Sequence, residues 1–356
     1  MCFPDFKVAS TRSYVHHTEV LKYLHNYAAH FHLLPYIHFE HHLEKVTRTE
    51  SVAKWIVTLR DLKNCSTVTK QFDVIFLAPG RYCIPKMPSI DSIDQFTGTA
   101  IHSHYYRHRE PFTGQKVAII GAGPSGLDIC GEVATVAEQV ILLNRRTPFK
   151  GMPANVQQIN GEVLAFKDKS IAISIDGNAP VEFSIDSVIF ATGYLFNLPY
   201  LDSKSCGLSV NDDQTIAGLY RHLINIEQPS MALMSVLIRV LPFPLFHQQV
   251  IFFVKHVLGE VQLPPKDVMI ARVSEEFAKR RALGFRPQDR HLTDFDLHEQ
   301  YHNELVEEGQ IEPLAPVVLK FYRHLGAVRA ENIHTYKEKN YQIVSDENFE
   351  ETVDTK

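Results

Sequence analysis

The sequence has few cysteines, and none stands in the paired motifs that build disulfide frameworks. Five cysteines are scattered through 356 residues, an odd number without a CxxC pair. This usage excludes a disulfide-stapled scaffold and is typical of reduced thiols in an intracellular protein. The cysteines are Cys2, Cys65, Cys83, Cys130 and Cys206.

Metal-ligand spacings, an excess of positive charge and long apolar runs are also missing. The 19 histidines include no HExxH or Cys/His pattern, so we predict no metal site. The net charge of -5 gives no electrostatic basis for binding nucleic acid. The most hydrophobic stretch, residues 231–257, is interrupted by charged residues and prolines. We therefore expect a buried core segment there and no transmembrane anchor.

Residues 1–12 contain neither the basic leader nor the apolar core of a signal peptide, so we expect a cytoplasmic protein. The length suits two domains with a substantial core. Hydrophobic residues make up 45% of the chain and charged residues 22%, as is ordinary for a globular protein. A homo-oligomer is possible, because nothing in the sequence determines the oligomeric state.

The stretch around which the chain is organised runs from Lys116 to Arg146. The apolar run 117–120 predicts a strand buried on both faces, and a helical apolar pattern over 127–137 precedes a second strand at 140–143. A GxGxxG turn joins the first strand to the helix, with Gly121, Gly123, Pro124, Ser125 and Gly126 as its candidate cofactor-binding residues.

Each glycine of such a turn has a separate task. The first permits the tight turn, the second lets a pyrophosphate approach the backbone, and the third lets the helix pack close to the strand. The phosphates then bind the free N–H groups at the helix start. We predict that this turn binds a dinucleotide; a plain glycine-rich loop is the alternative.

The end of the second strand indicates which nicotinamide cofactor binds. NAD-binding domains place an acidic residue there for the ribose 2′-hydroxyl, whereas this chain has Asn144, Arg145 and Arg146. Guanidinium groups suit a 2′-phosphate, so we predict NADP(H). Two solvated arginines at a strand end are the alternative.

Further elements are predicted on both sides of this stretch. Strands are expected at 37–49, 54–62, 65–72 and 72–77, antiparallel strands around an Asp176-Gly177 turn within 161–185, and another strand at 188–191. Helices are expected at 274–283, 293–308 and 317–325. The pieces from 111 to 197 fit one compact domain.

Several motifs together resemble the flavin-containing monooxygenases, and within them the shorter insect-type forms. The signature FxGxxxHxxxY is present as Phe96, Gly98, His102 and Tyr106, and FATGY as residues 190–194. Supporting stretches are HHTEVLKYL, INIEQPSM and PFPLF. The resemblance runs from residue 1 to about residue 325 and includes the glycine turn.

The resemblance implies an α/β fold with two Rossmann-like dinucleotide-binding domains. An NADP-binding domain at 111–197 would be inserted into an FAD domain made of 1–110 and 198–335, with a flexible tail at 336–356. In this family NADPH reduces FAD, and the reduced flavin forms a C4a-hydroperoxide with oxygen. A nucleophilic nitrogen or sulfur substrate then takes the distal oxygen, so the implied activity is of the N,N-dimethylaniline monooxygenase type.

The resemblance implies a structural role, and not a catalytic one, for the signature residues. His102 is expected at the domain junction and not as a base, while Thr192 and Gly193 are expected in a turn near the cofactors. The flavin supplies the hard chemistry, so no catalytic side chain is assigned.

The sequence also departs from the family pattern. It has one GxGxxG turn where the family has an earlier one for FAD, and it lacks the threonine-asparagine pair that precedes the stretch resembling residues 1–6. We therefore expect a chain whose first FAD-binding βαβ unit is missing, along with any signal that preceded it. Gly80 follows Pro79 where the family commonly has cysteine or threonine, and Ser235 replaces a usual glycine.

Two alternatives follow. A chain lacking the first FAD turn would bind NADP(H) without catalysing oxygenation. A Baeyer–Villiger enzyme would use a related intermediate on ketones, although its signature around the histidine is longer than the one seen here.

Overall fold

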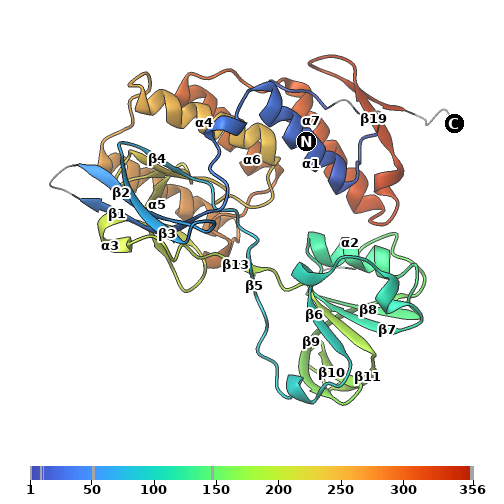
Figure 1. Ribbon diagram of the computed structural model, residues 1–356. Coiled ribbons are helices and arrows are strands. Elements are labelled where there is room, and N and C mark those ends of the chain that lie inside the picture. The colour runs from blue at the N-terminus through green and yellow to red at the C-terminus, as the bar shows by residue number, and fades with distance from the viewer. Residues whose placement is uncertain (1, 9, 11, 50–52, 146–147, 353–356) are drawn as a thin grey trace. The chain divides into compact units, whose positions relative to one another are not determined.

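The computed structural model describes residues 2–8, 10, 12–49, 53–145 and 148–352, and the chain divides into two compact units (Figure 1). Unit 1 comprises Met1–Arg81, Phe196–Arg323 and Tyr341–Glu350. Unit 2 comprises Tyr82–Leu195, His324–Asn340 and Glu351–Lys356. None of the described helices is both long and apolar enough to cross a membrane.

Unit 2 is built on a seven-stranded sheet with the order β11-β10-β9-β8-β7-β12-β6. The strands from β9 to β6 in this order are parallel, while β10 and β11 join as antiparallel strands. The bounds are β6 (Thr99–His102), β7 (Lys116–Ile120), α2 (Pro124–Val133), β8 (Gln139–Asn144), β9 (Val156–Lys167), β10 (Ser170–Ile175), β11 (Val181–Ser184) and β12 (Ser187–Phe190).

The two faces of this sheet have different covers, because successive side chains of a strand point to opposite faces. Val117 and Ile119 of β7 pack with Leu127, Cys130 and other residues of α2. Ala118 packs on the opposite face in the cluster formed with β9 and β10. Figure 1 shows α2 lying along one face of the sheet. The strand–turn–helix–strand prediction for 117–143 is confirmed.

Unit 2 also contains segments outside the predicted range 111–197. β6 belongs to it because Thr99–His102 pairs in parallel with β12. Short elements complete the unit: β5 (Ile84–Pro85), β13 (Tyr194–Leu195), η2 (Ile93–Gln95), η3 (Ser103–Tyr105), η4 (Glu110–Phe112) and η6 (Tyr336–Glu338). The segment 324–340 is tied to it by an ion pair of 2.9 Å between Lys337 Nζ and Asp128 Oδ1 of α2.

The described part of unit 1 contains two sheets of three or more strands. The first is antiparallel, with β1 (His41–Thr49), β2 (Lys54–Asp61) and β3 (Ser66–Phe72) in that order. The second has the order β16-β17-β18-β4, and its strands are β4 (Ile75–Leu77), β16 (Leu219–Tyr220), β17 (Ile224–Asn225) and β18 (Met231–Leu233). The strands predicted at 37–49, 54–62 and 65–72 are confirmed with slightly shorter bounds.

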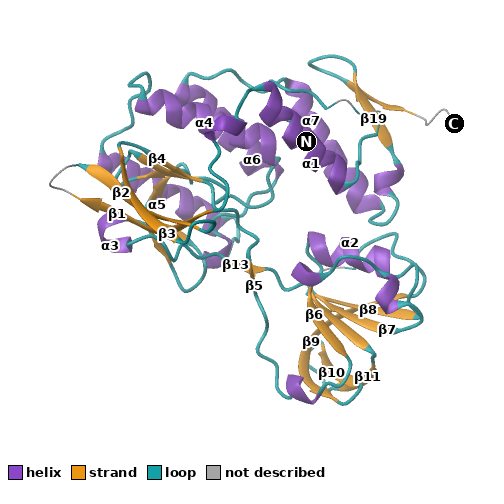
Figure 2. Ribbon diagram, viewed as in Figure 1, coloured by secondary structure: helices purple, strands orange, loops and turns teal. Residues whose placement is uncertain are grey.

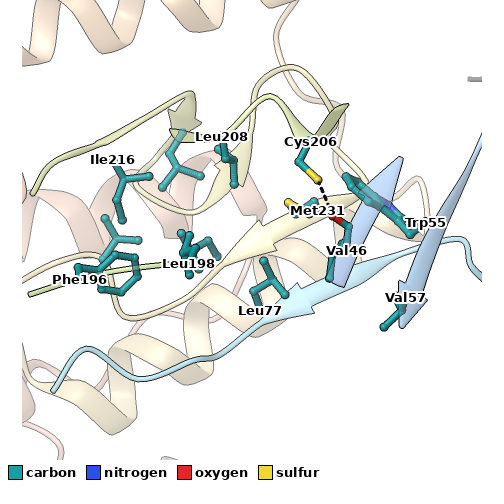
Figure 3. Close-up of a cluster of buried hydrophobic side chains, with 13 residues drawn as sticks. Val46, Trp55, Val57, Leu77, Phe196, Leu198, Cys206, Leu208, Ile216 and Met231 are labelled. Carbon is teal, nitrogen blue, oxygen red and sulfur yellow. Dashed lines mark hydrogen bonds between the residues drawn. The ribbon is translucent and has the colours of Figure 1, made fainter. Parts of the chain in front are cut away.

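A buried cluster joins these two sheets (Figure 3). Trp55 of β2 is fully buried and packs with Leu77 of β4 and Met231 of β18. The thiol of Cys206 donates to the Val46 carbonyl oxygen of β1 over 3.5 Å, the contact drawn dashed in Figure 3. Burial raises the pKa of this thiol. Cys206 is therefore a core residue rather than a reactive thiol.

Helices make up most of the rest of unit 1 (Figure 2). They are α1 (His17–His30), α3 (Ser203–Cys206), α4 (Pro242–Val257), α5 (Lys266–Ala282), α6 (Phe295–Gly309) and α7 (Pro316–Glu331), which runs past Arg323 into unit 2, with η1 (Leu34–Tyr36) and η5 (Pro287–Asp289). The start of α6 is capped by Asp294, whose carboxylate accepts from the Leu297 N–H at 2.8 Å. The small pairs β14 (Ser209–Val210) with β15 (Ile216–Ala217) and β19 (Asn340–Ile343) with β20 (Phe349–Thr352) complete the fold.

The segment expected as a tail from residue 336 contains the β19–β20 pair. Aromatic side chains explain why this part is ordered: Tyr341 and Phe349 lie with their ring centres 5.2 and 4.8 Å from that of Phe321 on α7. Residues 353–356 lie outside the described part.

Candidate functional site

The glycine turn of unit 2 contains two glycines that the fold itself requires. Gly121 has φ +108°, and a Cβ there would lie 2.5 Å from the carbonyl oxygen of Ala191. A Cβ on Gly126 would lie 2.0 Å from the carbonyl oxygen of Gly121. Both distances are far below van der Waals contact, so these positions exclude any side chain.

Gly123 differs from its two neighbours. Its φ is -73°, which any residue adopts, and no atom of the described protein lies within 4 Å of the Cβ position. Packing within the chain therefore does not require a glycine here. In dinucleotide-binding turns of this sequence pattern, the second glycine lets a pyrophosphate come close to the backbone.

The start of α2 supplies donors toward the same space. Gly123 is the N-cap and accepts from the Leu127 N–H at 3.0 Å, the first intrahelical bond. Pro124 occupies the first helical position, where the missing N–H costs nothing. The N–H groups of Ser125 and Gly126 precede that first bond, so they have no partner within the helix and are available to an anion.

Two further candidate residues follow β12 at the same edge of the sheet. Ala191 donates its N–H to the Ile120 carbonyl at 2.9 Å, which brings the Thr192-Gly193 turn beside the glycine turn. The Thr192 hydroxyl donates to the Lys86 carbonyl, and the Lys86 N–H donates to the Gly193 carbonyl at 3.0 Å. This turn is thereby fixed from both sides.

His102 holds the same turn with a defined proton. Its Nδ1 accepts from the His104 N–H at 3.0 Å, so Nε2 carries the hydrogen and donates to the Gly193 carbonyl at 2.9 Å. The residue is 1% exposed, and burial lowers the pKa of the imidazole. With both nitrogens engaged in the neutral ring, His102 positions the turn and has no lone pair for a base.

The other signature residues brace the same unit. A Cβ on Gly98 would lie 2.2 Å from the Asp186 carbonyl and 2.5 Å from the Phe96 ring, which itself packs on Phe166 with ring centres 5.4 Å apart. The Tyr106 hydroxyl donates to Glu132 of α2 at 2.7 Å, and burial raises the pKa of this phenol. The signature thus connects the antiparallel strands, the Thr192-Gly193 turn and α2.

Arg145 follows the end of β8, as predicted, and its side chain is largely exposed. The guanidinium lies 3.3 Å from a carboxylate oxygen of Glu162 on β9. Sequence reasoning missed Glu162, because the pairing depends on the register between two parallel strands and not on a local motif. Arg146 lies outside the described residues.

The chain matches the flavin-binding monooxygenase-like family over residues 1–152 and 150–322. It is a member of that family. The senecionine N-oxygenase of Tyria jacobaeae is 28% identical over 353 residues, which cover 95% of this chain and 74% of the relative. The flavin-containing monooxygenase FMO GS-OX-like 2 of Arabidopsis thaliana is 30% identical over 329 residues, which cover 86% of this chain and 68% of the relative.

A solved structure gives the same result for this monooxygenase. The S-allyl-L-cysteine S-oxygenase of Allium sativum superposes with a TM-score of 0.84 and 26% identity, covering 96% of this chain and 78% of that one. The predicted family and α/β fold with Rossmann-like domains are therefore confirmed.

Among its described residues, unit 1 of this monooxygenase has strand ends but no second glycine turn between a strand and a helix. β4 and β18 are parallel neighbours, followed by Gly80 with φ +75° and by Ser235 with φ +66°. In the described part of unit 1, no strand leads through a GxGxxG turn into a helix. A dinucleotide cradle like that of unit 2 is thus not found among these residues, and we assign none of them to FAD.

Unit 1 does contain a buried series of hydrogen bonds, called here the hydrogen-bonded chain, that the sequence did not reveal. The Ile216 N–H donates to His291 Nε2 at 3.0 Å, His291 Nδ1 lies 2.9 Å from His222 Nδ1, and His222 Nε2 lies 2.8 Å from a Glu276 carboxylate oxygen. Arg280 donates to the same oxygen at 3.0 Å.

The Ile216 amide determines which ring nitrogens of the hydrogen-bonded chain carry a hydrogen. Since Ile216 can only donate, His291 must carry its hydrogen on Nδ1, and His222 must accept there and donate from Nε2 to Glu276. Burial lowers the pKa of His291 well below its usual value, and the neighbouring His222 and arginines lower it further. The His291 ring is neutral in this arrangement. The residues described include no group of three or more His, Cys, Asp or Glu side chains that could hold a metal ion.

Proposed function

We propose that this family member is an NADPH- and FAD-dependent monooxygenase that oxygenates soft nitrogen or sulfur nucleophiles. The observation that carries the proposal is the β7–turn–α2 arrangement followed by Arg145, in a chain of a flavin-binding family. The names of two relatives, one an N-oxygenase and one an S-oxygenase, support nitrogen and sulfur as the acceptor atoms.

The residues of unit 2 are proposed to hold NADP(H). Gly123 leaves room for the pyrophosphate, the N–H groups of Ser125 and Gly126 bind it, and Arg145 binds the 2′-phosphate. Arg146 is proposed to assist. The Thr192-Gly193 turn, held by neutral His102, borders the site and moves no proton.

FAD, when bound, would supply the electron transfer and the oxygen transfer. The contribution of the protein is then to bind, to orient and to exclude water, which needs no acid–base pair of side chains. Unit 2 is proposed as the NADP-binding domain and unit 1 as the FAD-side domain.

Reconstitution with FAD tests this proposal. Purified protein incubated with FAD and then desalted should be yellow, show a flavin absorbance band and oxidise NADPH faster when an amine or sulfide is added. A folded protein that stays colourless after this treatment would contradict it. A ketone substrate in parallel separates N- or S-oxygenation from Baeyer–Villiger chemistry, which would consume the ketone.

A second candidate function is NADP(H) binding without oxygenation. The observation that favours it is the lack of a glycine turn between strand and helix in the described part of unit 1. Calorimetry would then detect NADPH binding but neither flavin binding nor turnover. Failure to bind NADPH would reject both candidates.

A further inference from the structure

Arg145 and Glu162 lie at one edge of the unit 2 sheet because of the strand register. β8 and β9 are parallel, and their last aligned pair is Asn144 with Asn160. Arg145 and Glu162 follow this pair on their respective strands, at the carboxyl edge where ligands of open α/β sheets bind. Their side chains approach to 3.3 Å.

Arg145 directly follows β8, and the chain is held again at residues 149 and 150. The Gln158 side chain accepts from the Phe149 N–H at 2.8 Å and donates to the Phe149 carbonyl at 2.9 Å. The Ile333 N–H donates to the Lys150 carbonyl at 3.1 Å. Residues 149 and 150 are thereby tied to β9 and to the segment 324–340.

Glu162 belongs to the face of the sheet that α2 covers. Val156 of β9 packs in the same cluster as α2, and Gln158 and Glu162 are separated from it by even numbers of residues on the strand. A dinucleotide bound at the start of α2 and extending across β8 would therefore bring its ribose toward Arg145 and Glu162 together.

The Glu162 carboxylate would have opposite effects on a phosphorylated and on an unphosphorylated ribose. A 2′-phosphate carries between one and two negative charges at neutral pH and would share Arg145 with Glu162, so like charges face each other across one guanidinium. An unphosphorylated ribose has a 2′-hydroxyl that can donate a hydrogen bond to a carboxylate. Glu162 thus opposes one cofactor and not the other.

We propose that Glu162 is a specificity-determining residue that limits the preference for NADP(H) over NAD(H) by competing with the 2′-phosphate for Arg145. The proposal rests on the proposed function, because it assumes that the dinucleotide binds at this edge. The Arg145–Glu162 pair, and not Arg145 alone, sets the selectivity.

Replacing Glu162 by glutamine tests the proposal, since it removes the charge and keeps the shape. The dissociation constants of NADP+ and NAD+ are measured by calorimetry for the full chain and the Glu162→Gln variant at low salt and at high salt. We expect the ratio Kd(NAD+)/Kd(NADP+) to rise about three- to tenfold at low salt and less at high salt, where screening weakens exposed charges.

Glu182→Gln is the matched control. Glu182 is an exposed glutamate of the same unit, paired with Lys167 at 2.8 Å on the antiparallel part of the sheet. Its substitution should leave the ratio unchanged.

Three results would overturn the proposal. An unchanged ratio in Glu162→Gln would mean that the carboxylate does not compete, and a lower ratio would mean that it positions Arg145 for the phosphate. In both cases NADP+ binding by the unsubstituted chain would leave the proposed function standing. No binding of NADP+ or of 2′,5′-ADP by the unsubstituted chain would refute the proposed function and this proposal together.

Discussion

Arg145 is the described residue proposed to bind the 2′-phosphate directly. Arg145→Ala should weaken NADPH binding about ten- to a hundredfold and NADH binding less than threefold, because a charge-assisted contact to the 2′-phosphate is lost. Fluorescence titration of both nucleotides checks this. Arg109→Ala, at another exposed arginine of unit 2, is the control. Equal weakening of NADPH and NADH would show that Arg145 does not bind that phosphate.

Ser235 stands at a backbone position that suits glycine. Its φ of +66° lies in the left-handed region, where a Cβ is crowded by the following carbonyl. Ser235→Gly should raise the free energy of unfolding by about 0.5–1 kcal/mol, measured by urea titration. Ser274→Gly, within α5, should lower it by a similar amount. A destabilised Ser235→Gly variant would mean that the serine side chain contributes more than the strain costs.

In the turn between β7 and α2, packing requires Gly126, and ligand binding is proposed to require Gly123. Gly126→Ala places a Cβ 2.0 Å from the Gly121 carbonyl oxygen, so it should lower the stability of the protein by more than about 2 kcal/mol. Gly123→Ala meets no protein atom, so it should cost no more than about 1 kcal/mol, the loss from a poorer N-cap, and still weaken NADP+ binding by about tenfold or more. Thermal melts with and without NADP+ measure both effects.

The pair of variants is informative in either direction. If Gly123→Ala bound NADP+ normally, the open space at this glycine would not be where the pyrophosphate approaches. If Gly126→Ala kept full stability, the contact between β7 and α2 would have to relax more easily than the described packing suggests.

The sequence predicted the elements whose signals are local. The strand, glycine turn and helix at 117–137 follow from apolar periodicity and glycine spacing within one stretch, and the structure confirms them. The Arg145–Glu162 pair could not be predicted, because it depends on parallel register. Nor could the His222–His291 contact, whose partners are 69 residues apart in the chain.

At the scale of the whole molecule, each unit is assembled from separate parts of the chain. Composition and spacing gave no signal that 82–110 and 324–340 lie in the unit of the glycine turn. Strand pairing of β6 with β12 and the Lys337–Asp128 ion pair bring them there. The extent of a unit follows from such long-range contacts, and these leave no pattern in a local window.

Buried histidines should make the whole protein sensitive to acid. His302 of α6 is 2% exposed, and burial lowers its pKa to about 3, whereas an unfolded histidine titrates near 6.5. Between these values the unfolded state binds a proton that the folded state does not, so the free energy of unfolding falls as pH falls. The slope is at most about 1.4 kcal/mol per pH unit for this residue.

Urea titrations at pH 7, 6 and 5 measure that slope. The His302→Gln variant should lose the part of the slope that comes from one proton, even if its stability at pH 7 differs. His25→Gln, at an exposed histidine of α1, should keep the wild-type slope. A wild-type slope in His302→Gln would contradict the assignment of this proton uptake to His302.

The hydrogen-bonded chain from Ile216 to Glu276 has one direction only. Every hydrogen in it points from the backbone amide toward the carboxylate, and reversing the direction would require Ile216 N–H to accept, which an amide cannot do. A proton arriving at Glu276 therefore has no onward route through His222 and His291. This series of hydrogen bonds therefore does not conduct protons away from Glu276. The two rings have a structural role in unit 1, in which they connect the Ile216 amide to the Glu276 carboxylate.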